Sequence, residues 1–360
     1  MTQSFVTLDS NVQYCYEDSG VPNCDIYTTL VFIHGLGFNA AIFKKLVSLA
    51  VRHECRVISL YRRDYAPSTP FTETEISPCR TGGDQEDFLR LRGVEIAKFL
   101  LAFIRANNIP QASGPSGEGG IVVIGWSLGA MHVHAMLAFL DALTKEAVAE
   151  LERYLRTIIF HGQVHRQNSS TAAMGLPHSH LGDMSMWSNQ NIEERLKLFA
   201  KWTTSYYEHP DILSKDLGHP ELYLEFNTPS NTKSPSLHDI SPQEFAGLTA
   251  INAFAGSDLA TLAINENIRK TLTERAIFNR VLASRYLPGV RVVYMCGGET
   301  LGALVYAMWM LEKAADNPKS YFGDDAQKAR VMEFCYLPKG NHFFFWDDPK
   351  WALDQYLSWA

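Results

Sequence analysis

The pentapeptide Gly125–Gly129 (GWSLG) has residue types and spacing suited to nucleophilic catalysis. It follows the apolar run Ile121–Ile124 and precedes a stretch with helical periodicity. In a G-x-S-x-G sequence between a strand and a helix, the glycines permit a sharp turn that exposes the serine hydroxyl. The helix N-terminus adds partial positive charge where negative charge would develop. Ser127 is therefore the candidate nucleophile.

A second glycine-containing turn, HGLG at residues 34–37, follows the buried strand predicted at Leu30–Ile33. Acyl transfer needs backbone N–H donors for the oxyanion, one after the nucleophile and one in an earlier loop. We expect the amides of Leu36 and Leu128 to be these donors, although the HGLG turn could also be only a tight strand exit. The substrate pocket is expected to be lined by residues of these two motifs: His34, Gly35 and Trp126. For Trp126, packing beneath the sheet is an open alternative.

The general base should be a histidine on a loop after the last strand. His342, in the sequence GNHF, follows the strand predicted at Arg330–Tyr336 and precedes the helix predicted at Pro349–Trp359. The other histidines lie on the helix after Ser127, beside a strand end or in the middle third, so the base is assigned to His342. The sequence has no H-E-x-x-H or comparable ligand set, and we expect neither a metal nor another cofactor.

A carboxylate should orient the histidine and stabilise its charged form. Glu299, in the sequence CGGET, follows the strand predicted at Val290–Cys296 and is the candidate acid. Alternatively, Glu299 only complements the dipole of the helix that follows it. Asp258, late in the middle third, is the reserve candidate.

Strands and helices alternate at both ends of the chain, which predicts an α/β fold with a largely parallel sheet covered on both faces. Further strands are expected at Phe5–Leu8, Val12–Tyr16, Arg56–Leu60 and Thr157–Phe160, the first two as a hairpin. From about residue 164 to 289, helical segments broken by Pro, Gly, Ser and Asn replace the alternation. We therefore predict a core at residues 1–164 and 290–360 and a largely helical cap inserted at 165–289.

The order serine, acid, histidine on these turns resembles the α/β-hydrolase superfamily. The resemblance covers residues 4–163 and 290–358, and HGLG, GWSLG and GNHFFFWDDP carry it. It implies a mostly parallel sheet of eight strands and a serine-hydrolase triad. One departure concerns the acid, because many members have Asp in a G-x-x-D turn where Thr300 stands here. Ser127 also argues against the epoxide hydrolases and haloalkane dehalogenases, relatives that use an Asp nucleophile.

Composition restricts the partners. The 360 residues are 46% hydrophobic and 20% charged, as in an ordinary globular protein, and 32 basic against 39 acidic residues give a net charge of −7. Because no dense basic run occurs, nucleic acid and anionic membranes are not expected partners. No apolar run reaches the length of a membrane span. The sequence opens without a secretory pattern and its six cysteines form no CxxC pair, so we expect a cytoplasmic protein with reduced thiols.

The sequence thus predicts a cofactor-free serine hydrolase that cleaves an ester, thioester or lactone through an acyl-enzyme. Aromatic and Met residues in the cap, among them Trp187, Trp202 and Tyr207, suggest a hydrophobic small-molecule substrate, although they can equally form the cap's own core. Two alternatives stay open. One is a carbon–carbon bond hydrolase, or a lyase or cyclase of a biosynthetic pathway, with the same triad. The other is a non-catalytic ligand receptor on a hydrolase scaffold; the oligomeric state is also open.

Overall fold

One eight-stranded sheet forms the centre of the computed structural model, which describes residues 2–9, 11–113, 117–162 and 191–360. The strand order is β1-β2-β4-β3-β5-β6-β7-β8. The strands are β1 (Thr2–Thr7), β2 (Gln13–Asp18), β3 (Thr28–Ile33), β4 (Cys55–Leu60), β5 (Ile121–Trp126), β6 (Leu155–His161), β7 (Arg291–Cys296) and β8 (Met332–Tyr336). β2 is antiparallel to β1 and β4, and every pair from β4 to β8 is parallel. The predicted α/β architecture, including its N-terminal hairpin, is confirmed.

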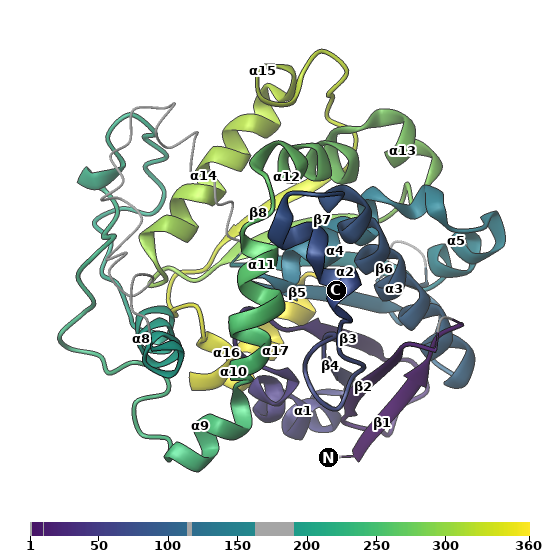
Figure 1. The fold of residues 1–360 in the computed structure, drawn as a ribbon, viewed down its shortest axis with the longest axis horizontal. Helices are drawn as coiled ribbons and strands as arrows, with labels where there is room; N and C mark the ends of the chain where they lie inside the picture. Colours follow the sequence, from purple (N-terminus) through teal and green to yellow (C-terminus); the bar gives the residue numbers. More distant parts are fainter. Residues whose placement is uncertain (1, 10, 114–116, 163–190) are drawn as a thin grey trace.

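The central strands are buried on both faces because helices cover both sides of the sheet (Figure 1). Along β3, Val31 and Ile33 join the hydrophobic cluster on one face, and Leu30 and Phe32 join the cluster on the other, as strand alternation requires. The first cluster includes α3 (Gln85–Ala106), α4 (Gly129–Ala138), α5 (Lys145–Glu152) and α14 (Gly302–Asp316). The second includes α1 (Lys44–Leu49), α16 (Phe344–Asp347) and α17 (Pro349–Ser358). Two further helices are α2 (Glu73–Thr81) and α15 (Pro318–Phe322).

Helix α4, which begins just after Ser127, is held against α3 by a close backbone contact. A Cβ at Gly93 of α3 would lie 2.3 Å from the carbonyl carbon of Ala135, so only glycine fits there. Asp84 caps α3 by accepting a hydrogen bond from the backbone N–H of Asp87. This packing fixes the helix that the nucleophile turn enters.

The chain between His161 and Arg291, here termed the β6–β7 segment, contains helices and no strand in its described part. Its helices are α8 (Ile192–Thr204), α9 (Pro242–Leu248), α10 (Ile251–Ala253), α11 (Leu259–Leu262), α12 (Glu266–Thr273) and α13 (Arg280–Arg285). Two π-helical stretches, η6 (Phe254–Asp258) and η7 (Glu274–Phe278), interrupt them. Leu272, Ile277 and Phe278 belong to the same hydrophobic cluster as residues of α4.

Within the described residues, no helix combines the length and apolar character that crossing a bilayer requires. All six cysteines carry free thiols.

Candidate active site

Ser127 occupies the turn between β5 and α4 in a left-handed backbone conformation, with φ of 54°. Its N–H donates to the carbonyl of His161 at 2.9 Å, which fixes it beside the end of β6. The flanking glycines are sterically required: a Cβ at Gly125 would lie 2.7 Å from Ala130 Cα, and one at Gly129 would lie 2.1 Å from the Ile33 carbonyl oxygen. Such a strained, over-determined serine is typical of a nucleophile.

The HGLG turn lies directly against Ser127. A Cβ at Gly35 would be 2.7 Å from Ser127 Cβ and 3.2 Å from its Oγ, so glycine alone permits this approach. Within the described part of the chain, the backbone N–H groups of Leu36 and Leu128 donate no hydrogen bond. Both residues are buried, and a buried N–H without an acceptor is rare. One such amide directly after a strained serine, and a second in the turn whose Gly35 approaches that serine, are the kinds of donor that form an oxyanion hole.

His342 lies on the loop between β8 and α16, and its ring packs on Trp126, with ring centroids 5.1 Å apart. The Trp126 Nε1–H donates to the His342 carbonyl at 3.1 Å, which ties the histidine loop to the strand before Ser127. Gly162, directly after His161, faces the imidazole: a Cβ there would lie 2.4 Å from Cε1 and 2.5 Å from Nδ1. Ser127 and His342 are thus both anchored at the ends of β5 and β6. Among the described hydrogen bonds, none joins Ser127 Oγ to the His342 ring.

The imidazole of His342 is buried, and its Nδ1 has no hydrogen-bond partner among the described residues. Burial lowers the pKa of His342 to about 3, because the charged form would lose its hydration. At neutral pH the ring is therefore neutral and able to accept a proton.

The structure does not bring Glu299, the predicted acid, to the imidazole of His342. The Glu299 carboxylate forms a salt bridge with Lys233 through Oε1 and accepts the N–H of Gly340 through Oε2 at 3.0 Å. Glu299 therefore braces the loop two residues before His342 and makes no described hydrogen bond with its ring. Thr300, at the position where many relatives have Asp, is buried, and its hydroxyl meets no hydrogen-bond partner in the described part of the chain.

Asp258, the reserve acid, is also engaged elsewhere. Its fully buried carboxylate accepts hydrogen bonds from Arg62 Nη2 at 2.8 Å, from Gly37 N–H at 2.8 Å and from the Tyr65 hydroxyl. All of these partners belong to the core and none to the His342 loop. Asp258 thus contacts the HGLG turn and not the base.

His34 and Trp126, which we expected to line the substrate pocket, are instead packed inside the protein. His34 Nε2 accepts the N–H of Arg62 at 3.0 Å, and Nδ1 lies 3.1 Å from the Gly35 carbonyl. Burial, followed by the charge of Arg62, lowers the pKa of His34 well below its usual range. Trp126 is 1% exposed. Of the two alternatives, lining the pocket or packing in the interior, the structure therefore shows packing. Besides His342, its ring contacts four phenylalanines: Phe38, Phe43, Phe343 and Phe345.

Residues from the cap also pack. Tyr207 is fully buried against Leu301 and Leu304, and Trp202 is partly buried against this group, whereas Trp187 lies outside the described residues. Sequence reasoning missed Gly162, Arg62 and Tyr65. The sequence signal for the last two is the polar stretch Arg62–Tyr65, which begins two residues after the end of the buried strand β4.

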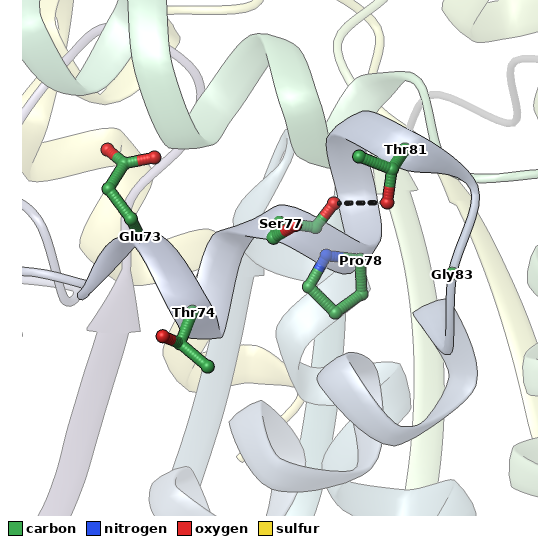
Figure 2. A pocket seen from close by; sticks show the side chains of 6 residues that line it. All are labelled: Glu73, Thr74, Ser77, Pro78, Thr81 and Gly83. Carbon is green, nitrogen blue, oxygen red and sulfur yellow. Dashed lines mark hydrogen bonds between the residues drawn. The ribbon is translucent and has the colours of Figure 1, made fainter.

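Figure 2 shows a surface pocket along α2, lined by Glu73, Thr74, Ser77, Pro78, Thr81 and Gly83. The Thr81 hydroxyl donates to the Ser77 carbonyl and the Glu73 carboxylate pairs with Arg80, so these two side chains have partners within α2. It includes no predicted site residue. The described residues also contain no cluster of three or more His, Cys, Asp or Glu side chains that could hold a metal ion.

The chain belongs to the alpha/beta hydrolase family, whose family model matches residues 30–355. This membership supports a hydrolase. A search of curated proteins finds no match. Among solved structures, an epoxide hydrolase mutant from Vigna radiata is similar with 13% identity and a TM-score of 0.54, covering 99% of this chain and 98% of that chain. A lipase-esterase related protein from Clostridium acetobutylicum is similar with 12% identity and a TM-score of 0.50, covering 97% and 99%. At these identities the two structures establish the fold alone.

Proposed function

We propose that this protein is a serine hydrolase that cleaves an ester, thioester or lactone of a hydrophobic small molecule through an acyl-enzyme. The observation that carries the proposal is the close approach of the HGLG turn to the strained Ser127, together with the amides of Leu36 and Leu128, which donate no hydrogen bond among the described residues. In this mechanism, Ser127 Oγ attacks the carbonyl carbon while His342 takes the hydroxyl proton. The amides of Leu36 and Leu128 stabilise the oxyanion.

The intermediate then collapses as His342 returns the proton to the leaving group. Water, activated by the same imidazole, attacks the acyl-enzyme and regenerates Ser127. Each oxyanion donor contributes about 3–4 kcal/mol to the stabilisation of the transition state. A neutral imidazole suits the base, and the low pKa of His342 keeps it neutral at physiological pH.

The proposal is tested with a fluorophosphonate probe, which phosphonylates an activated serine. We expect stoichiometric labelling of the wild-type protein at Ser127, found by peptide mass spectrometry, and no labelling of Ser127→Ala. His342→Gln should lower the labelling rate by roughly three to four orders of magnitude. Absence of labelling in the wild type, or labelling that persists in Ser127→Ala, would refute the nucleophile.

The unpartnered Nδ1 of His342 supports a second candidate function, a ligand receptor on a hydrolase scaffold. Loss of the acid from a serine triad lowers kcat by about 10⁴-fold, and a protein with so slow a reaction can act by binding. Carbon–carbon bond cleavage has no comparable observation in its favour. A panel of p-nitrophenyl esters of increasing acyl length separates the two functions. Multiple turnovers support the hydrolase. The receptor is supported if Ser127 is acylated once and the acyl group is then released more slowly than the unreacted ester dissociates.

A further inference from the structure

A buried ion pair joins the β6–β7 segment to the HGLG turn. Asp258 is the last residue of the π-helical stretch η6, and its carboxylate is fully buried. Arg62, two residues after the end of β4, pairs with it at 2.8 Å, and the Arg62 side chain is 6% exposed. A buried pair of this kind is costly to desolvate, so its position invites a functional explanation.

The pair holds the two peptide planes on either side of Leu36. Arg62 Nη2 donates to the Gly35 carbonyl at 2.8 Å and Arg62 Nε donates to the His34 carbonyl at 3.0 Å. On the other side of Leu36, the Gly37 N–H donates to Asp258 Oδ2 at 2.8 Å. The charged side chains thus hydrogen-bond to the turn both before and after Leu36, whose amide we assign to the oxyanion hole.

Because a peptide unit is planar, the hydrogen bond to the Gly35 carbonyl also fixes the direction of the Leu36 N–H. In a trans peptide the C=O and N–H of one unit are coplanar and point in opposite directions. Since the Gly35 C=O points at Arg62, the Leu36 N–H of the same unit points away from Arg62. A Cβ built on Gly35 would lie 2.7 Å from Ser127 Cβ, so this peptide unit lies close to the nucleophile.

We propose that Asp258, together with Arg62, is a positioning residue that orients the Leu36 amide in the oxyanion hole. Because Asp258 comes from the β6–β7 segment, docking of η6 on the core completes the hole. Tyr65 supports the arrangement, since its hydroxyl donates to Asp258 and lies 3.0 Å from the Gly37 N–H as a second acceptor. Burial, followed by the neighbouring Asp258 charge, raises the pKa of Tyr65 well above its usual range, so the hydroxyl keeps its proton.

This inference rests on the proposed serine hydrolase, and a pair of probes tests it. A fluorophosphonate places P=O in the oxyanion hole, and its P=S counterpart places a larger, weaker acceptor there. In either reaction the Ser127 oxygen bonds to phosphorus, the P–F bond breaks, fluoride leaves and His342 takes the hydroxyl proton. Oxyanion-hole donors favour the P=O probe, so the ratio of the two labelling rates reports their alignment and not the overall integrity of the fold.

Asp258→Asn offers one oxygen and one NH2 group, which cannot satisfy Arg62 and the Gly37 N–H together. We expect its labelling rate with the P=O probe to fall about 100-fold, the range seen on loss of one oxyanion donor, with a much smaller change for P=S. Tyr65→Phe keeps the carboxylate and should lower the P=O rate by roughly 5-fold, again with little change for P=S. This second variant preserves the ion pair and serves if Asp258→Asn fails to fold.

Asp18→Asn is the matched control. Asp18 pairs with Arg56 through two hydrogen bonds of 3.0 and 2.5 Å between β2 and β4, and it contacts none of the site residues. Its P=O to P=S ratio should equal that of the wild type. Equal losses with both probes in Asp258→Asn and Tyr65→Phe, or an unchanged ratio, would overturn the positioning role while leaving the hydrolase intact. Absence of wild-type labelling overturns the hydrolase and this inference together.

Discussion

Replacing Gly162 by Ala tests the position of His342 directly. A Cβ at this position would lie 2.4 Å from His342 Cε1 and 2.5 Å from Nδ1, whereas ordinary contacts begin at 3.4 Å, so the ring must retreat by about 3.4 − 2.4 = 1.0 Å. A displacement of this size between reacting groups costs about 10²-fold in rate. Gly162 also has a positive φ of 59°, which adds about 1–2 kcal/mol of backbone strain to an alanine.

The assay separates these two effects. The rate of fluorophosphonate labelling at Ser127 should fall about 100-fold in Gly162→Ala, and the free energy of unfolding in urea should fall by about 1–2 kcal/mol. Gly82→Ala is the control, since Gly82 has a similar φ of 74° but nothing within 4 Å of the added carbon. It should lose similar stability and no reactivity. Wild-type labelling by Gly162→Ala, or an equal loss in Gly82→Ala, would refute the placement of His342 against Gly162.

Three more predictions follow from the charges around the site. With a pKa of about 3 for His342, kcat/KM on a p-nitrophenyl ester should stay level from pH 8 to pH 5; an acid limb near pH 7 would reveal a carboxylate partner. Glu299→Gln should change kcat less than threefold, as should Lys233→Ala, because their salt bridge does not include the imidazole; a loss near 10⁴-fold would restore Glu299 as the triad acid. The unfolded histidine binds a proton below about pH 6.5, and the folded one does not until about pH 3. The free energy of unfolding therefore decreases as the pH is lowered through this window. His342→Gln should therefore lose about 2 kcal/mol less than the wild type between pH 7 and 5 in urea titrations, and equal losses would contradict the burial effect.

The strands and both turns at the site could be predicted because their causes are local. Leu30–Ile33 and Ile121–Ile124 are continuous apolar runs, which in a parallel sheet occupy strands buried on both faces. The glycines around Ser127 are required by contacts within a few residues of the turn or with the neighbouring strand. Such local patterns predict where an element begins and ends, and the order of the strands then follows from the fold class.

The environment of the acids could not be predicted because their partners are remote in sequence. Asp258 meets Arg62 across 196 positions, and Glu299 meets Lys233 across 66. The position of an acidic residue after a strand indicates where its backbone lies. It does not indicate which cation or amide its carboxylate contacts.

The electrostatic arrangement of the site also predicts whether Asp258, at the HGLG turn, or Glu299, at the His342 loop, affects the reactivity of Ser127 more. The described structure places a buried ion pair on the HGLG turn and leaves His342 Nδ1 without a charged partner. Asp258 accepts the Gly37 N–H of the turn that carries a proposed oxyanion donor, whereas Glu299 accepts the Gly340 N–H and pairs with Lys233 without a described contact to the imidazole. Substitutions at Asp258 should therefore lower the rate of fluorophosphonate labelling at Ser127 more than substitutions at Glu299 do. A triad that depends on Glu299 as its acid would give the reverse order.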